Sequence, residues 1–170
     1  MGKLFTYLKE TELFYNLSQA QMEQVEKICE EQSYTEGELI FRENSRDKEV
    51  YLLLDGRVEI LVNPALVTSA PTSSHKVSII ATLQPGQVFG EVALVDEGVR
   101  SASARSADPH TVVARIPRTK FMLLCNMYPE LGYRVMYNLA AALAQKMRSA
   151  DMKIREMMLY QQVKRPNSEE

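Results

Sequence analysis

The spacing of hydrophobic positions changes twice along the chain, and each change predicts a different kind of structure. At the N-terminus the spacing is helical, and residues 4–17 predict one or two short helical turns. Ser18 followed by Gln21 has the pattern of a capping box, so we expect a helix over residues 19–31. Together these elements form a predicted N-terminal helical segment, residues 1–33.

Residues 34–117 show the pattern of short strands separated by turns, which indicates a β-roll. Strands are predicted over residues 39–41, 50–54, 58–62, 77–83, 101–106 and 111–116. Asp55-Gly56 is a strong hairpin signal, and residues 63–76, rich in Pro, Ser and Thr, predict a long, mobile loop. Such a succession of short strands predicts an antiparallel barrel or jelly roll.

Helical spacing returns in the last third of the chain. It predicts a short helix over residues 118–126 and a long one over about residues 129–162. We therefore take residues 118–163 as a C-terminal helical segment. The remaining tail, residues 164–170, is polar and is expected to be disordered.

The long helix carries a heptad stripe, the pattern of one helix packing along another. Its members are Met136, Ala140, Leu143, Met147, Ala150, Ile154 and Met157. We expect the first half of the stripe to lie on the barrel. Beyond Arg148 a small barrel offers little surface, so we expect the second half to mediate self-association as a homodimer.

Composition and charge narrow the class of protein. With 170 residues, 45% of them hydrophobic and 25% charged, the chain is expected to fold as one soluble globular domain with an appended helix. A net charge of −2 argues against general nucleic-acid binding, which needs a concentrated basic face. The chain has no apolar run of transmembrane length and no secretory signal, so we expect no membrane association and a cytoplasmic location.

Residues with metal-binding or nucleophilic chemistry are few. The two cysteines, Cys29 and Cys125, lie in apolar helical patterns and lack zinc-ligand spacing, so we expect buried free thiols. The two histidines, His75 and His110, are far apart. This argues against a histidine metal site, including that of a cupin-like enzyme on a jelly roll, and against a Ser-His-Asp or Cys-His catalytic group.

The most informative segment is residues 83–106, which places an acid, an arginine and glycines in a short turn between two apolar strands. The amides of Gly90 through Ala93 are expected to be free at the start of a helical turn, and Arg100 can fork onto two phosphate oxygens. Glu91 can accept a bond from a ribose hydroxyl, and Ser101 adds a donor. The segment therefore predicts a site for a phosphorylated sugar, although the spacing equally allows a structural ion pair between Glu91 and Arg100.

Three stretches of sequence carry a family resemblance. They are Gly37-Glu38-Leu39-Ile40-Phe41, then Tyr51-Leu52-Leu53-Leu54-Asp55-Gly56-Arg57-Val58-Glu59-Ile60, and then Pro85 through Leu94 followed by Arg100-Ser101-Ala102. Over roughly residues 12–148 the chain resembles the cyclic nucleotide-binding domain family. The resemblance implies an α+β fold, an antiparallel jelly roll of about eight strands flanked by N-terminal helices and a long C-terminal helix. It also implies a phosphate-binding cassette at residues 89–102.

The same resemblance implies roles for individual residues. Glu91 would take the ribose 2′-hydroxyl, Arg100 the cyclic phosphate, and the long helix would close over the base. The residues implied to bind cAMP or cGMP are Phe89, Gly90, Glu91, Val92, Ala93, Arg100, Ser101, Ala102, Ile60 and Ile80. The base lid is expected near Ala142, Lys146 and Met147, and no other cofactor is implied.

The chain departs from the family pattern at three positions. Val99 stands where many members have proline before the arginine, and Ala142 stands where some offer an arginine to the base. Asn44 replaces a usual turn glycine, and asparagine tolerates the positive φ that such a turn can need.

Two functions follow from these features. The favoured one is a stand-alone regulatory domain without catalysis, in which a cyclic nucleotide drives a conformational switch read by an unidentified effector protein. The alternative is a degenerate barrel used for protein interaction or dimerisation without nucleotide. A transcription factor would need a helix-turn-helix after the long helix, and too few residues follow Arg148 in this chain for a DNA-binding domain.

Overall fold

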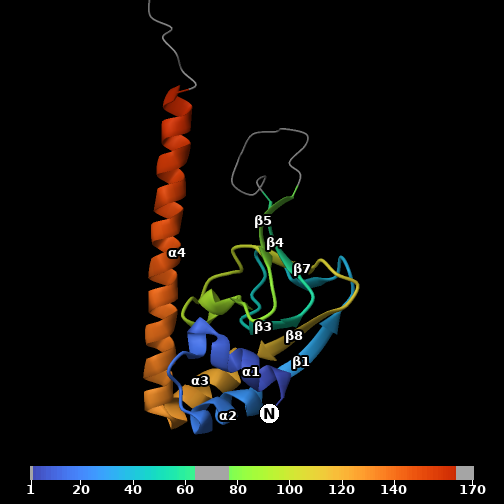
Figure 1. Ribbon diagram of the computed structural model, residues 1–170, viewed down its shortest axis with the longest axis vertical. Helices are drawn as coiled ribbons and strands as arrows, with labels where there is room; N and C mark the ends of the chain where they lie inside the picture. The colour runs from blue at the N-terminus through green and yellow to red at the C-terminus, as the bar shows by residue number, and fades with distance from the viewer. Residues whose placement is uncertain (1, 64–76, 164–170) are drawn as a thin grey trace, which may run out of the picture.

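The computed structural model (Figure 1) describes residues 2–63 and 77–163. Its helices are α1 (Lys3–Glu10), η1 (Glu12–Phe14), α2 (Gln19–Ile28), η3 (Glu91–Leu94), α3 (Arg118–Met127) and α4 (Pro129–Val163). Its strands are β1 (Glu30–Tyr34), β2 (Leu39–Phe41), β3 (Val50–Asp55), β4 (Val58–Val62), β5 (Ser78–Leu83), β6 (Val88–Phe89), β7 (Ser103–Ser106) and β8 (Thr111–Ile116). The predicted loop at 63–76, except its first residue, and the predicted tail at 164–170 lie outside the described residues.

The strands form two four-stranded antiparallel sheets with the orders β1-β8-β3-β6 and β2-β7-β4-β5. Helices α1, α2 and α3 gather at one end of this roll, and α4 runs along its side (Figure 1). The architecture confirms the expected α+β jelly roll of eight strands, flanked by N-terminal helices and a long C-terminal helix.

Strand β3 is hydrophobic at nearly every position because both of its faces are buried. Alternate side chains of a strand point to opposite faces, and β3 is covered on both. Val50, Leu52 and Leu54 face the core shared with the helices. Tyr51 and Leu53 face the core between the two sheets. The strand therefore joins the helical layer to the roll.

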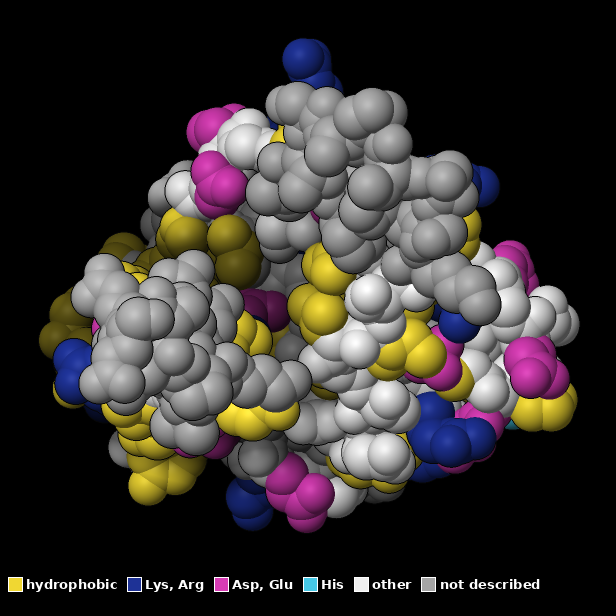
Figure 2. Space-filling view, turned by 90° about the horizontal axis from the view of Figure 1, so that it is seen from above, with side chains coloured by type: hydrophobic (Ala, Val, Ile, Leu, Met, Phe, Trp, Pro, Cys, Tyr) yellow, Lys and Arg dark blue, Asp and Glu magenta, His cyan; other side chains and the backbone are white. Residues whose placement is uncertain are grey.

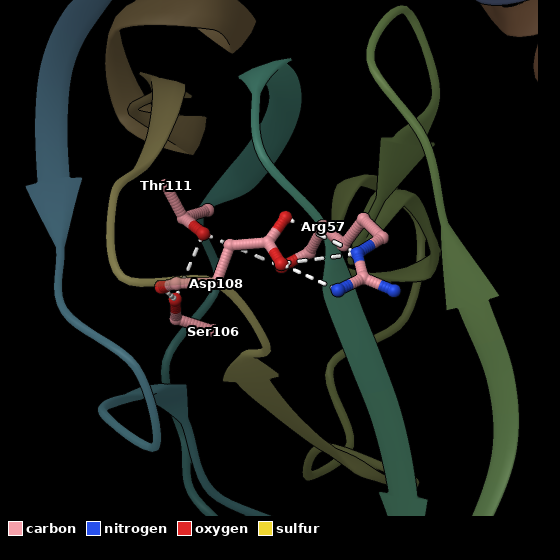
Figure 3. A network of polar contacts seen from close by, with 4 residues as sticks. All are labelled: Arg57, Ser106, Asp108 and Thr111. Atoms are coloured by element: carbon pink, nitrogen blue, oxygen red, sulfur yellow. Dashed lines mark hydrogen bonds and ion pairs between the residues drawn. The ribbon is translucent and has the colours of Figure 1, made fainter.

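The turn between β7 and β8 is held against the β3–β4 hairpin by a polar network (Figure 3). The Arg57 guanidinium donates from Nη2 to Asp108 Oδ1 at 2.6 Å and from Nε at 3.0 Å. These hydrogen bonds hold the pKa of the Asp108 carboxyl below its usual range. The Ser106 hydroxyl donates to Thr111 Oγ1 at 2.8 Å, and both side chains are buried. The hairpin signal in the sequence thus marks a fixed corner of the roll.

The N-terminal segment differs from the prediction at its end. The capping box at Ser18 is present, but α2 ends at Ile28 instead of continuing to residue 31, because Cys29 is extended with φ −73° and ψ 145°. Strand β1 begins at Glu30, pairs with β8, and so belongs to the β-roll. The predicted helical segment 1–33 is therefore too long. The sequence of β1 is polar because it is an edge strand whose side chains are half-buried or exposed.

Smaller differences occur within the roll. Strand β6 was not predicted, since it has only two residues between a turn and η3. Strand β7 begins at Ser103, two residues later than the predicted 101–106. Strand β5 begins at Ser78 instead of residue 77.

The long helix packs along only part of its length. Leu131, Val135 and Leu139 are buried in the core with the N-terminal helices, and Leu143 packs against that core. Met147 is 69% exposed, and the large hydrophobic side chains that follow it up to Tyr160 are exposed as well. The expectation that the first half of the stripe lies on the body of the domain holds only in part: Met136 and Leu143 are half-buried against this core, but Ala140 is exposed, and the fully buried positions lie beside the predicted stripe. Within residues 2–63 and 77–163, no helix has the length and hydropathy needed to cross a membrane.

Both cysteines are free, Cys125 buried and Cys29 half-buried. The Cys29 thiol donates to the Val25 carbonyl, with 3.2 Å between sulfur and oxygen. Burial, with a smaller contribution from the charge of Glu26, raises the pKa of Cys29 to about 12. Burial also raises the pKa of Cys125. The two thiols are thus protonated and weakly nucleophilic at neutral pH.

Candidate ligand-binding site

A cavity of about 480 Å³ is lined by the predicted cassette, strands β4 and β5, and Lys146 of α4. Its volume falls in the range of roughly 300–1,000 Å³ that is usual for small-molecule sites. Every residue that the sequence implied for nucleotide binding lines it, from Ile60 and Ile80 on the strands to the cassette residues between Phe89 and Ala102. Figure 2, which looks at the molecule from above, shows hydrophobic side chains gathered around a hollow.

Arg100 is the buried cation of this cavity, with 7% of the residue exposed. Its Nη1 donates to the Gly90 carbonyl at 3.0 Å, and its Nη2 donates to Asp47 Oδ2 at 2.8 Å and to the Glu49 carbonyl. The guanidinium carbon lies 4.2 Å from the centroid of the Phe41 ring. The Nε of Arg100 is buried and has no hydrogen-bond partner among the described residues.

The backbone on both sides fixes where Arg100 lies. The Arg100 amide donates to the Ser45 carbonyl at 2.9 Å, and the Asn44 amide donates to the Arg100 carbonyl at 2.8 Å. Asn44 has φ +62°, which confirms the positive φ expected at this turn. The guanidinium is thus held in one orientation by the turn between β2 and β3.

Asp47 is a charged residue of the cavity that sequence reasoning missed. Its carboxylate pairs with Arg100 and accepts a bond from the Tyr51 hydroxyl at 3.2 Å. Burial, together with the charge of Asp47, raises the pKa of Tyr51, so the phenol stays protonated and can donate. The sequence did show an acid in the predicted turn at 44–47. That this acid meets Arg100 depends on the tertiary contact between two segments that are distant in sequence.

Glu91 lies at the start of η3, and only 9% of its side chain is exposed. Its Oε1 accepts a hydrogen bond from the Lys146 ammonium of α4. Glu91 therefore does not pair with Arg100. The alternative interpretation of the sequence, an ion pair between these two residues, is wrong, because each has a different partner.

The expected row of free amides is shorter than predicted. The Ala93 amide donates to the Gly90 carbonyl at 3.2 Å and is engaged. Glu91 and Val92 are the first residues of η3, and amides at this position find no acceptor within their own helix. Within the run from Gly90 to Ala93, the Ala93 amide is thus engaged, and the amides of Glu91 and Val92 at the start of η3 remain candidates to meet an anion.

The walls of the cavity are apolar. Phe89 is buried and stacks with Tyr51 at a centroid distance of 5.3 Å. Ile80, Val92 and Val99 are exposed hydrophobic side chains, with 57% of Ile80 accessible. Exposed apolar groups that surround a cavity are typical of surfaces that a ligand covers.

The three residues of the expected base lid lie in different places. Lys146 lines the cavity through its contact with Glu91. Ala142 lines a neighbouring cavity of about 330 Å³ between α4, the N-terminal segment and the cassette. Met147 is exposed and lines neither cavity. The structure therefore brings only one of the three to the candidate site.

Gly90 allows the arginine to reach its place, so its replacement tests the geometry. Gly90 has φ +72°, and a Cβ there would lie 2.7 Å from Nη1 of Arg100 and 3.1 Å from the Glu49 carbonyl oxygen. We expect Gly90→Ala to lower the free energy of unfolding and to displace Arg100, since both atoms must shift. Urea unfolding measures the loss.

Gly37→Ala is the matched control for this variant. Gly37 has φ +80°, and nothing lies within 4 Å of the place that a Cβ would take. It therefore shares the backbone strain but not the clash. We expect Gly90→Ala to lose about 1–2 kcal/mol more than Gly37→Ala. Equal losses in the two variants would contradict the close approach of Arg100 to Gly90.

Comparison with known proteins places these features in a family. The family model described as cyclic nucleotide-binding domain matches residues 31–128, which is more than half of the 170-residue chain. The cyclic AMP receptor protein of Thermus thermophilus is 29% identical over 147 residues, covering 86% of this chain and 62% of that protein. Human cGMP-dependent protein kinase 2 is 27% identical over 125 residues, covering 74% of this chain and 16% of the kinase.

A solved structure resembles the fold as well. The crystal structure of Thermus thermophilus catabolite activator protein matches with a TM-score of 0.72 and 28% identity, over 87% of this chain and 63% of that one. The chain spans less than two thirds of the length of these curated relatives. The similarity therefore concerns the jelly roll and its helices, which carry the candidate site.

Proposed function

This chain is a member of the cyclic nucleotide-binding domain family, and from the geometry of its cavity we propose that it binds cAMP or cGMP. The proposed role is regulatory, without catalysis, and the nucleotide acts as the signal. The observation that carries the proposal is the buried Arg100, whose Nε has no partner among the described residues and whose side chain lines a cavity of ligand size.

The cavity offers a complementary partner for each part of the ligand. A cyclic phosphate carries one negative charge, which Arg100 and the amides of Glu91 and Val92 can meet. The ribose hydroxyl is a donor, and Glu91 is a carboxylate acceptor in the same cavity. The base is flat and largely apolar on its faces, which suits the exposed wall formed by Ile80 and Val99.

The proposed switch depends on one shared core. Leu94, the last residue of η3, is buried in the same cluster as Leu131, Val135 and Leu139 of α4. A cassette that moves on binding therefore disturbs the packing of the long helix. The ligand shifts the balance between two arrangements by the difference in its affinity for them.

Equilibrium titration by calorimetry tests the proposal. We expect cAMP or cGMP to bind with micromolar affinity, because a few charge-assisted bonds of about 1.5–3 kcal/mol each combine with apolar contacts. The linear 5′-monophosphates are the controls, because they have the same base and ribose but no phosphate ring. They should bind more weakly than the cyclic nucleotides. If no nucleotide produces heat or a thermal shift, the chain is instead a nucleotide-independent interaction module.

We propose in addition that the outer half of α4 pairs two copies of the chain. Met147, Ile154 and Met157 fall on the heptad stripe and are all more than half exposed. A coiled-coil seam would cover them. Light scattering at high protein concentration should therefore give twice the mass of one chain.

A pair of variants distinguishes dimerisation through the heptad stripe from nonspecific hydrophobic association. Ile154→Glu places a charge on the stripe, and we expect it to give a monomer, because the seam would have to bury that charge. Met152 is also exposed but lies off the stripe, so Met152→Glu should remain a dimer. A wild-type chain that stays monomeric, or two variants that behave alike, would contradict dimerisation through this stripe.

A further inference from the structure

The Lys146–Glu91 ion pair joins two elements that are far apart in sequence. Lys146 is on α4 and Glu91 is on η3, and the ammonium donates to Oε1 of the carboxylate. The lysine side chain is 62% exposed and the glutamate side chain only 9%. Both residues line the 480 Å³ cavity and also the neighbouring 330 Å³ cavity. The pair is therefore part of the wall between the two cavities.

We propose that Lys146 competes with the nucleotide for Glu91 and so sets the concentration at which the ligand binds. This inference rests on the proposed function, which gives Glu91 to the ribose hydroxyl. Where the ammonium donates to Oε1 of Glu91, it occupies one acceptor oxygen of the carboxylate and ties α4 to the cassette. A 2′-hydroxyl that donates to this same oxygen, Oε1, takes the place of the ammonium, so on this proposal the bond breaks when the nucleotide binds.

The Lys146–Glu91 ion pair is weak enough for the nucleotide to displace it. An ion pair whose cation is mostly exposed gains little, because water screens it and the long lysine side chain loses freedom. A hydroxyl that donates to a nearly buried carboxylate forms a stronger bond. The nucleotide also brings its phosphate contact with Arg100. A ligand can thus displace the lysine, at the cost of a moderately lower affinity.

The neighbouring cavity contains acidic side chains that can accept the Lys146 ammonium once it leaves Glu91. That cavity is also lined by Glu10, at the end of α1, and Glu12, at the start of η1. The flexible lysine side chain can exchange the cassette carboxylate for an acid of the N-terminal segment. Meanwhile α4 stays attached below this point, because the Asn138 side chain donates to the Leu13 carbonyl at 3.1 Å and to the Tyr15 carbonyl at 2.8 Å.

If Lys146 competes with the nucleotide, removing it has the opposite effect on nucleotide affinity from removing a base lid. A lid contacts the bound nucleotide, so its removal weakens binding. A competitor occupies Glu91 when the nucleotide is absent, so its removal strengthens binding. Because the Lys146 side chain is largely exposed, its replacement leaves the core of the domain intact.

Titration of Lys146 variants with the cyclic nucleotide that the wild type prefers tests the proposal. We expect Lys146→Met to bind about fivefold tighter than wild type, the size of effect that one partly exposed ion pair produces. Lys146→Arg keeps the cation and should bind like wild type. Lys153→Met, two helical turns further along α4 at another exposed lysine, is the matched control and should also bind like wild type.

The 2′-deoxy cyclic nucleotide identifies the group for which the lysine competes. It cannot use Glu91, so the gain of Lys146→Met should vanish with this analogue. Unchanged or weaker binding by Lys146→Met, or an equal gain with the 2′-deoxy form, would overturn the competition while the proposed function stands. If neither wild type nor any variant binds a cyclic nucleotide, the proposed function itself fails.

Discussion

Replacing Arg100 by alanine will lower the affinity for the cyclic nucleotide by about thirtyfold or more, which corresponds to about 2 kcal/mol. Among the described residues that line the cavity, Arg100 is the buried cation, and the phosphate would lose it, while the Asp47 side chain would lose its ion-pair partner. Calorimetric titration of wild type and variant measures the loss.

Arg46→Ala is the control for this experiment. Arg46 is exposed and lies in the same turn as the Asn44 and Asp47 contacts, so its removal changes the net charge equally without touching the cavity. Its affinity should match wild type. Circular dichroism verifies that the Arg100 variant is folded. Near-wild-type affinity of a folded Arg100→Ala would show that the phosphate is not held there.

The second large effect concerns stability. Leu139 of α4 is 1% exposed and packs in the core with the N-terminal helices and Leu94. We expect Leu139→Ala to lower the free energy of unfolding by about 2–5 kcal/mol, because it loses buried surface and leaves a cavity. Urea unfolding followed by circular dichroism measures this change.

Leu159→Ala is the matched control, since it makes the same change on the same helix at a side chain that is 62% exposed. It should alter the monomer's unfolding free energy by less than about 0.5 kcal/mol. Comparable losses in the two variants would mean that α4 does not pack on the domain as described. Leu139→Ala should also weaken nucleotide binding if α4 and the cassette share a core.

The sequence predicted the roll well where burial gives a strong pattern. Strand β3 is buried on both faces, so its residues form an unbroken hydrophobic run that no loop would tolerate. The capping box at Ser18 located the start of α2 to the residue. Its end was missed, because β1 is a polar edge strand and its pattern does not differ from that of an exposed helix.

The sequence predicted which cassette residues line the candidate site, but not which side chains pair with its two charged residues. The cassette is continuous in sequence, so its residues were certain to lie near one another. The partners of its two charges come from elsewhere: Asp47 lies 53 positions before Arg100, and Lys146 lies 55 after Glu91. Which distant side chain meets which charge depends on tertiary packing, and spacing within a segment carries no information on it.

On the proposed function, Arg100 and Glu91 together hold a cyclic nucleotide in one cavity. A crystal structure of the chain with cAMP or cGMP tests it most directly. We predict the phosphate on the Arg100 guanidinium, the ribose hydroxyl on Glu91, the base against Ile80 and Val99, and Lys146 withdrawn from Glu91. An empty cavity at saturating nucleotide, or a nucleotide bound away from Arg100, would contradict the account.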